Sequence, residues 1–231
     1  MNIMTGYLGA TEGEVLINGH NILEEPEAAK KSIGYLPEIP PLYLDMTVKE
    51  YLDFAAELKK VKKKDRKSEV DHVLKLVKLE EVEGRLIKNL SKGYKQRVGL
   101  AQAVLGFPEV IILDEPTVGL DPKQIIEIRE LIKELSKNHT IILSSHILAE
   151  VQAVCDYVMI IAHGKLVASD TPENLERLLN GSETIELTVK AEETRVREIL
   201  SKIEEIETVD YKEQQDGTTD IFYQDRRSEG Y

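Results

Sequence analysis

Two adjacent carboxylates, Asp114 and Glu115, follow directly after the apolar run Val110–Leu113. An uninterrupted apolar run that is too short for a helix is typical of a strand buried on both faces of a parallel sheet. The carboxyl ends of such strands face the ligand crevice. An aspartate there would suit a hard cation such as Mg²⁺, and a glutamate could accept a proton from an attacking water. An ordinary strand end capped by acids is the alternative, and the pair alone does not decide between the two.

A second segment, Asn89–Arg97, has residues suited to binding an anion. Ser91 is predicted to start a helix and Gly93 to lie in its first turn, so that unpaired backbone N–H groups and the positive end of the helix dipole point outward together. Glycine also lets the backbone approach an oxygen closely, as at phosphate-binding helix termini. A plain capped helix is the alternative interpretation.

Four short segments together resemble the ATP-hydrolysing subunits of ATP-binding-cassette (ABC) transporters. Leu90-Ser-Lys-Gly-Tyr-Lys-Gln96 resembles the signature of that family. The segments that look like its Walker B, D-loop and switch-histidine motifs are Leu113-Asp-Glu-Pro116, Gly119-Leu-Asp-Pro122 and Ser144-Ser-His146. The resemblance covers Met1 to Leu179, and four matches in the family's order and spacing make coincidence remote, whereas any one alone would be weak.

The resemblance implies a role for each acid and for the histidine. Asp114 would hold Mg²⁺ through water, Glu115 would be the general base, and His146 would contact the γ-phosphate of ATP. Outside this context a lone histidine is more often a surface or core residue whose ring nitrogens are hydrogen-bonded and which has no catalytic role. The implied cofactors are ATP and Mg²⁺, and the implied catalytic residues are Glu115 and His146.

The resemblance also implies a paired arrangement of subunits. In the family, two subunits enclose two ATP molecules, and each signature helix contacts the nucleotide that the other subunit holds. Ser91, Gly93 and Gln96 would then bind the cofactor of a second copy of this chain or of a paralogous ATPase subunit. Asp121 would lie at the interface between the two subunits and would be a further cofactor-binding residue there. A membrane-spanning permease subunit would be the further partner.

Two features depart from the usual pattern of the family. Lys92 and Tyr94 replace the glycine and glutamine that are commonest in the signature, which adds one positive charge beside the predicted anion site. Glu38 stands where the family most often has a glutamine that reaches the metal. A carboxylate there could bind Mg²⁺ directly, so Glu38 is a candidate metal and cofactor ligand beside Asp114, although it would also repel phosphate oxygens.

The phosphate-binding loop of the family, G-x-x-x-x-G-K-[ST], occurs nowhere in the 231 residues, and neither Gly6 nor Gly9 begins such a pattern. Met1–Leu8 resembles instead the helix that follows the loop. We therefore expect an ABC domain that is truncated at its N-terminus and lacks a central strand beside Val110–Leu113. Because the burial of such a strand is worth on the order of 10 kcal/mol, we also expect the chain to be unstable alone.

The remaining pattern predicts an α/β framework around these segments. Asn18-Gly19 favours a β-hairpin, because both residues tolerate positive φ. Short apolar runs predict strands at Ile33–Leu36 and Thr140–Leu143, parallel to the strand before Asp114. Helix starts are predicted by the capping box of Thr47 with Glu50 and by Asp121 followed by Pro122.

The predicted fold class is α/β, with a P-loop NTPase-like ABC ATPase sheet and an inserted helical subdomain at about residues 45–106. Residues 1–180 would form this domain. After the Asn180-Gly181 break, a pattern of strand, helix, strand and strand within residues 181–231 predicts a partial C-terminal accessory α+β unit.

Composition narrows the class of function. The chain has 42 acidic and 30 basic residues and a net charge of -12, which repels polyanions, so no nucleic acid is expected as a partner. A single cysteine fits a reducing compartment. The longest apolar runs, such as Tyr157–Ala162, fall far short of the roughly 18 residues of a membrane span. We expect a cytoplasmic protein, peripheral on the inner face of the cell membrane.

The leading hypothesis is an ATP-hydrolysing subunit that energises a separate membrane subunit, and the segment Tyr35–Tyr43 and the C-terminal unit resemble the exporter branch. The second hypothesis is a catalytically incompetent ABC fragment that acts as a dimer or interaction module and lends Ser91 and Gly93 to a full-length partner. A soluble ABC protein of translation or DNA maintenance is disfavoured by the acidic charge, the single signature and the lack of a coiled coil.

Overall fold

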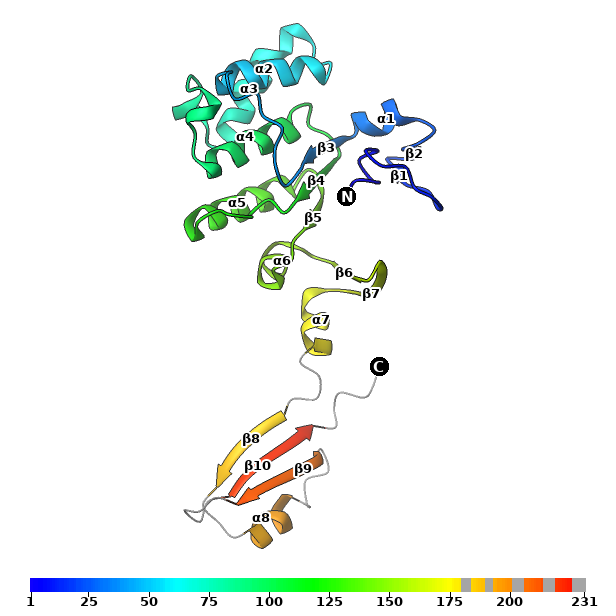
Figure 1. Ribbon diagram of the computed structural model, residues 1–231, viewed down its shortest axis with the longest axis vertical. Coiled ribbons are helices and arrows are strands. Elements are labelled where there is room, and N and C mark those ends of the chain that lie inside the picture. The colour runs from blue at the N-terminus through cyan, green and yellow to red at the C-terminus, as the bar shows by residue number, and fades with distance from the viewer. Residues whose placement is uncertain (180–183, 190–192, 201–205, 214–218, 226–231) are drawn as a thin grey trace. The chain divides into compact units, whose positions relative to one another are not determined.

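A computed structural model describes residues 1–179, 184–189, 193–200, 206–213 and 219–225 of the chain (Figure 1). It divides into two compact units, Met1–Cys155 and Asp156–Tyr231, and each is described here by itself. Asn180 and Gly181, at the predicted boundary between residues 1–180 and 181–231, lie outside the described residues. That boundary therefore stays a prediction.

The first unit is built on a parallel sheet of three strands, β3 (Ile33–Leu36), β4 (Val110–Asp114) and β5 (Thr140–Ser144), in the order β3-β4-β5. Val110 is aligned with Ile33 on one side and with Thr140 on the other. All three predicted strands are confirmed. The α/β fold class is confirmed too, because helices and parallel strands alternate through this unit.

The sheet corrects one expectation. Both edges of β4 are occupied, by β3 and by β5, so the prediction of a missing strand beside Val110–Leu113 is wrong. The apolar run of β5 is long enough to pair with the whole of β4 in register, from Val110 opposite Thr140 to Asp114 opposite Ser144. A further strand of this sheet can pair only with β3 or β5.

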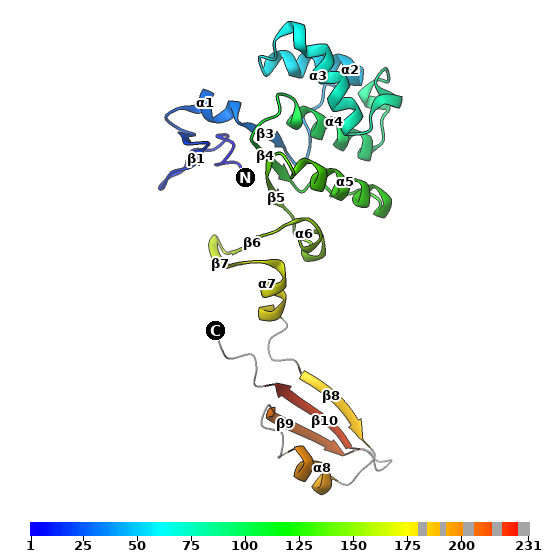
Figure 2. The same cartoon turned by 180° about the vertical axis from the view of Figure 1, so that it is seen from behind.

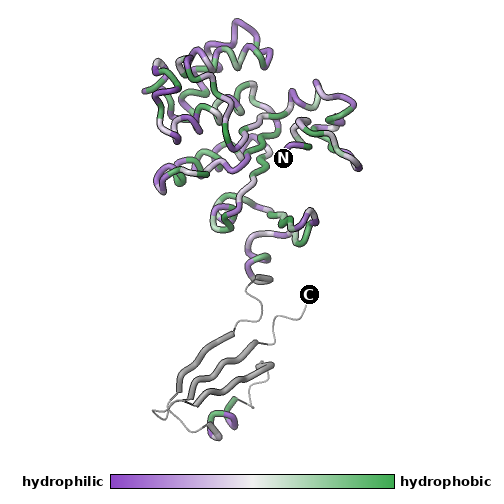
Figure 3. Tube along the Cα trace, viewed as in Figure 1, coloured by the Kyte–Doolittle hydropathy of each residue, from purple (hydrophilic) through white to green (hydrophobic). Residues whose placement is uncertain are grey.

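Alternate residues of the strands face two separate hydrophobic clusters. Ile111 and Leu113 belong to the larger cluster, together with residues of the helices that follow β3 and β4, whereas Ile112 belongs to a smaller cluster on the opposite face, together with Ile33 and Ile22. The side chains of Ile111, Ile112 and Leu113 are fully buried. In Figure 3 these strand segments are coloured as hydrophobic. Burial on both faces explains why the run carries no polar alternation.

A helical subdomain packs against the larger cluster. It contains α2 (Val48–Leu58), α3 (Lys63–Leu76), the short 3₁₀ turns η1 (Glu80–Val82) and η2 (Ile87–Asn89), and α4 (Lys92–Val104). Seen from either side, α2, α3 and α4 lie together beside the sheet (Figures 1 and 2).

The predicted capping box at the start of α2 is confirmed. The Thr47 hydroxyl accepts a hydrogen bond from the Glu50 N–H at 3.3 Å, and the Glu50 carboxylate accepts one from the Thr47 N–H at 2.8 Å. The bond from the Thr47 N–H, and after it a bond of 2.8 Å that the Thr47 hydroxyl donates to the same carboxylate, lower the pKa of Glu50. Two of the helix's unpaired N–H groups are thereby satisfied, which fixes where α2 begins.

Lys59, directly after α2, ties that helix to the end of α4. Its Nζ donates to the carbonyl oxygens of Ala103 at 2.9 Å and Leu105 at 2.7 Å. Burial lowers the pKa of Lys59 from 10.5 to about 8, while the charge of Glu69 acts in the opposite direction. Between these two values the unfolded chain holds the proton and the folded chain does not, so folding stability rises with pH in this window.

Replacing Lys59 by methionine removes this titration. The quantity of interest is the free energy of unfolding of the parent minus that of Lys59→Met. We expect this difference to increase by on the order of 2 kcal/mol when the pH is raised from about 7 to about 10.5. Urea unfolding at the two pH values measures the difference, and Lys60→Met is the matched control because the Lys60 side chain is 81% exposed. A difference between parent and Lys59→Met that stays constant or shrinks with pH would contradict the expectation.

The N-terminal segment confirms one prediction and corrects another. Asn18 and Gly19, with φ of 50° and 84°, turn between β1 (Leu16–Ile17) and β2 (His20–Asn21), as predicted. The helix α1 (Pro26–Lys31) follows. Residues 1–8, however, form turns and not the predicted helix. Gly6 has a φ of 68°, which breaks a right-handed helix after the single turn closed by the bond from Thr5 N–H to Met1 O.

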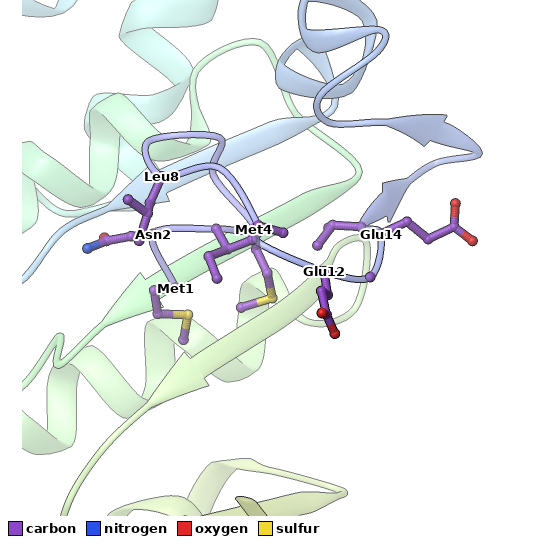
Figure 4. Close-up of a pocket in the computed structure, with 10 residues that line it drawn as sticks. Met1, Asn2, Met4, Leu8, Glu12 and Glu14 are labelled. Carbon is purple, nitrogen blue, oxygen red and sulfur yellow. The ribbon is translucent and has the colours of Figure 1, made fainter. Parts of the chain in front are cut away.

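The same segment surrounds an open pocket of about 580 Å³ (Figure 4). Met1, Met4 and Leu8 supply much of its apolar lining, and Glu12 and Glu14 lie at its side. Met1 and Met4 also pack against the smaller hydrophobic cluster. The segment thus covers part of one face of the sheet.

The rest of the first unit places helices between the strands. The helix α5 (Pro122–Leu135) connects β4 to β5, and α6 (Leu148–Val154) follows β5. Ile128, Leu131 and Leu135 bury one face of α5 in the larger cluster.

The second unit contains the hairpin β6 (Val158–Ala162) with β7 (Lys165–Asp170) and the helix α7 (Pro172–Leu179). It continues with β8 (Thr184–Val189), α8 (Glu193–Leu200), β9 (Ile206–Glu213) and β10 (Thr219–Asp225). The last three strands form an antiparallel sheet in the order β8-β10-β9. This confirms the predicted succession of strand, helix, strand and strand. Within the described residues no helix has both the length and the apolar character needed to cross a bilayer.

Candidate functional site

Asp114 lies at the carboxyl end of β4, next to Ser144 at the end of β5. Ser144 Oγ donates a hydrogen bond of 2.6 Å to Asp114 Oδ1. The strands β4 and β5 are neighbours in the sheet (Figure 1), and their register places the two residues directly opposite each other. The ends of two parallel strands thus bring a carboxylate and a hydroxyl together, as expected at the ligand-binding edge of an α/β sheet.

Glu115 has a backbone conformation that few residues with a side chain adopt. Its φ is 46°, and its N–H donates to Ser144 Oγ at 3.0 Å. The Val118 N–H donates back to the Glu115 carbonyl at 3.2 Å, which closes a turn directly after the strand. Positive φ at a non-glycine residue carries strain and is enriched at functional sites. The turn directs the Glu115 side chain differently from a regular strand residue.

His146 contacts the Glu115 carboxylate. Its Nδ1 lies 3.0 Å from both carboxylate oxygens of Glu115. A carboxylate only accepts hydrogen bonds, so this contact requires a protonated Nδ1. The His146 side chain is 68% exposed and that of Glu115 20% exposed, so the pair is open to solvent on the histidine side. Asp114, Ser144, Glu115 and His146 therefore form one continuous chain of contacts.

Tyr35, which the sequence did not single out by itself, joins this group from β3. Its hydroxyl lies 3.5 Å from Asp114 Oδ2, at the long limit for a hydrogen bond. Burial raises the pKa of the Tyr35 phenol, and the negative charge of Asp114 raises it further. Tyr35 belongs to an apolar run that reads as an ordinary strand, and only the pairing of β3 with β4 reveals the contact.

The donor set around Asp114 fits Mg²⁺, which prefers oxygen ligands and is usually held in phosphate sites by one or two carboxylates with water and substrate oxygens. The Asp114 carboxylate and the Ser144 hydroxyl are such oxygens. Glu38 is exposed, two residues after β3, and the structure records no hydrogen bond or ion pair of its carboxylate with the four contacting residues just described. Its predicted role as a metal and cofactor ligand stays a prediction.

The signature segment begins α4 as predicted. Ser91 is the N-cap, and its hydroxyl accepts a hydrogen bond from the Tyr94 N–H at 3.4 Å. Ser91 and Lys92 are exposed, whereas Gly93 is buried and Gln96 is only 3% exposed. The outward surface of the segment is therefore made by its first residues, and Gln96 lies in the interior of this unit.

Two glycines lock the signature segment against the segment around Asp121. A Cβ on Gly93 would lie 2.6 Å from Cδ of Gln124, in the first turn of α5. A Cβ on Gly119, whose φ is 71°, would lie 2.0 Å from Nζ of Lys92. Only glycine fits either place without displacing its neighbour.

Asp121 caps the start of α5, as predicted. Its Oδ1 accepts a hydrogen bond of 2.9 Å from the Gln124 N–H, and Pro122 occupies the first turn. Asp121 is exposed and lies beside the signature residues through Gln124. Apart from Glu38, which follows β3, the predicted site residues thus fall into two groups within this unit, one at the ends of β4 and β5 and one at the starts of α4 and α5.

The fold of the chain is that of ABC ATPase domains. A solved structure described as the ATP-binding subunit of an ABC transporter matches with a TM-score of 0.68 and 31% identity, over 78% of this chain and 75% of that one. The Clostridium perfringens protein cbiO1, described as part of the ABC transporter complex cbiONQ, matches with a TM-score of 0.69 and 26% identity, over 87% and 80% of the two chains.

The chain belongs to the ABC transporter family, because the model of that family matches residues 1–118. The bacitracin transport ATP-binding protein BcrA of Bacillus licheniformis is 38% identical over 179 residues, which is 77% of this chain and 58% of that protein. The chain spans between 54% and 58% of the length of this relative and two other bacterial ones that it matches.

Proposed function

We propose that this chain is the ATP-binding and ATP-hydrolysing part of an ABC transporter, acting beneath a membrane-spanning permease subunit on the inner face of the cell membrane. The observation that carries the proposal is the chain of contacts from Asp114 through Ser144 and Glu115 to His146. It joins a cation ligand, a proton acceptor and a proton donor at the edge of a parallel sheet, where phosphate chemistry is usual.

The residues support hydrolysis of the γ-phosphate in a simple scheme. A water oxygen bonds to the γ-phosphorus as the bond to the β–γ bridging oxygen breaks, and Glu115 accepts the proton that the water loses, leaving ADP and phosphate. His146 holds the Glu115 carboxylate in place through Nδ1. Mg²⁺ held by Asp114, and by Glu38 if it reaches the metal, would neutralise the charge on the phosphate oxygens.

A second ATPase subunit, a copy of this chain or a paralogue, is part of the proposal. Ser91 and Asp121 are exposed at the starts of α4 and α5. At the start of α4, whose N-cap is the neutral Ser91, unpaired N–H groups and the helix dipole favour an anion. Nucleotide held by the partner would be bound here, with Gly93 allowing the close approach and the buried Gln96 supporting the segment from within.

Within the family we propose the exporter branch. The supporting observations are the 38% identity to a relative named for bacitracin transport and the α+β succession after α7. The alternative is a catalytically incompetent module that only pairs with another subunit. The two candidates differ in whether a G-x-x-x-x-G-K-[ST] loop acts together with this site, since the 231 residues themselves hold no such motif.

One experiment separates the two candidates. We would compare the 231-residue chain with the same chain preceded by the phosphate-loop segment of BcrA, measuring Mg²⁺-dependent phosphate release and ATP-dependent dimerisation by light scattering. We expect hydrolysis and dimerisation by the extended chain and no hydrolysis by the 231-residue chain, because no lysine-bearing loop is present there to hold the phosphates. An extended chain that folds, binds ATP and dimerises without hydrolysing it would refute the enzyme and favour the module.

A further inference from the structure

Glu150, in α6, is an acid that the proposed chemistry does not use. It is only 5% exposed, although it lies in a helix whose first residues, Leu148 and Ala149, are exposed. A buried carboxylate is costly unless it is hydrogen-bonded and paired. The hydrogen-bond and ion-pair partners of the Glu150 carboxylate therefore indicate the role of this buried charge.

Two of the partners come from the loops that carry the proposed catalytic residues. The Thr117 hydroxyl donates to Glu150 Oε2, and Thr117 lies two residues after Glu115 in the turn that follows β4. Ser145 Oγ lies 3.4 Å from the same oxygen, and Ser145 directly precedes His146. One carboxylate oxygen thus contacts both loops.

The third partner holds the other oxygen. Nη2 of Arg129, in α5, lies 3.8 Å from Glu150 Oε1. The Ser145 hydroxyl also accepts a hydrogen bond of 3.1 Å from the Ile147 N–H, which leaves its own proton for Glu150. The carboxylate is thereby anchored to a helix on one side and to the two loops on the other.

We infer that Glu150 is a positioning residue, which sets the distance between Glu115 and His146 by holding the loops that carry them. The inference rests on the proposed function for its catalytic meaning, but the contact it concerns exists without nucleotide. The 3.0 Å approach of His146 Nδ1 to Glu115 joins residues 31 positions apart in the chain. Glu150 is a buried group of unit 1 that is hydrogen-bonded close to both residues. Its partner Thr117 lies two positions after Glu115, and its partner Ser145 lies one position before His146.

The test uses a change that removes the charge but keeps the shape. Glu150→Gln retains a single acceptor oxygen, so it cannot keep both loop contacts and the pairing with Arg129. Glu130→Gln is the matched control, because Glu130 is an exposed acid one residue from Arg129 in the same helix. The readout is the ¹⁵N chemical shift of His146 Nδ1 in the chain without nucleotide, with Glu115→Ala as the reference in which the contact is absent.

We expect the Nδ1 shift in Glu150→Gln to move toward the value in Glu115→Ala, and to be unchanged in Glu130→Gln. A folded Glu150→Gln protein with the parent shift would overturn the inference. If Glu150→Gln does not fold, two variants of its partner Thr117 test the inference instead. Thr117→Val removes the hydroxyl and is expected to move the shift, whereas Thr117→Ser keeps the hydroxyl and is expected to restore it; an unmoved shift in Thr117→Val would overturn the inference equally.

A kinetic readout in the hydrolysing extended chain distinguishes positioning from binding. We expect Glu150→Gln to lower kcat by about 10- to 100-fold with KM for ATP unchanged, because misplaced groups slow the chemical step. A raised KM with unchanged kcat would overturn the inference. If the parent itself does not hydrolyse ATP, the proposed function fails, while the Nδ1 shift still decides the role of Glu150.

Discussion

Replacing Glu115 by glutamine is expected to reduce ATP hydrolysis by about 100-fold or more while leaving ATP binding in place. Glutamine has nearly the same size as glutamate, so the turn after β4 and the packing around it are kept. What it lacks is a basic oxygen that can accept the proton of the attacking water. The lost step is therefore proton transfer and not nucleotide recognition.

The local geometry sharpens this expectation. Glu115 is 20% exposed and holds a strained φ of 46°, which a site would not keep for packing alone. Its one side-chain partner, among the contacts recorded, is His146. A glutamine amide could still accept a bond from His146 Nδ1, so the arrangement of the loop would persist while the chemistry stops.

The measurement is phosphate release by the extended chain, together with the retention of bound nucleotide after gel filtration. Glu109→Gln is the matched control, because Glu109 is exposed at the opposite end of β4 and the change removes the same charge. We expect Glu109→Gln to hydrolyse ATP at the parent rate. Unreduced hydrolysis by Glu115→Gln would mean that another group accepts the proton.

Replacing Gly34 by alanine is expected to lower the free energy of unfolding by about 3 kcal/mol. Gly34 is a buried residue of β3, and α4 crosses the strand there. An added Cβ would lie 2.1 Å from the carbonyl oxygen of Ala103 and 3.0 Å from Cγ of Pro108. The nearest atom is backbone, so the clash cannot be relieved by rotating a side chain.

Relief would require α4 to move away from the sheet. The same Ala103 carbonyl accepts the hydrogen bond of 2.9 Å from Lys59 Nζ, so such a shift would also strain the tie to α2. Urea unfolding measures the loss, and Gly84→Ala is the control, because nothing lies within 4 Å of an added Cβ there and its φ is not positive. An unchanged midpoint for Gly34→Ala would contradict the packing described for α4 and β3.

Local signals in the sequence predict the elements well. The parallel strands are marked by apolar runs that fit burial on both faces, and the starts of α2, α4 and α5 are marked by Thr47, Ser91 and Asp121. Each of these residues makes its capping bond within three positions. Such contacts depend on neighbours in the chain, which a single sequence displays.

Contacts between distant segments were not predicted. Tyr35 reaches Asp114 across 79 positions and Glu150 meets Thr117 across 33, and neither pairing leaves a mark in the local pattern. The missing strand beside Val110–Leu113 was wrongly predicted for the same reason, since apolar runs do not record which neighbour they pair with. Residues 1–8 resemble a helix of the family, but the chain leaves the helical conformation at Gly6, whose φ is positive, after one turn.

The fit of Gly93 against Gln124 and of Gly119 against Lys92 has a mechanical consequence. The side chains of Gln124 and Lys92 reach over the backbone at the two places where no Cβ is present, so the starts of α4 and α5 lie in contact. A molecule that docks on the exposed residues Ser91 and Asp121 would therefore meet both helix starts at once.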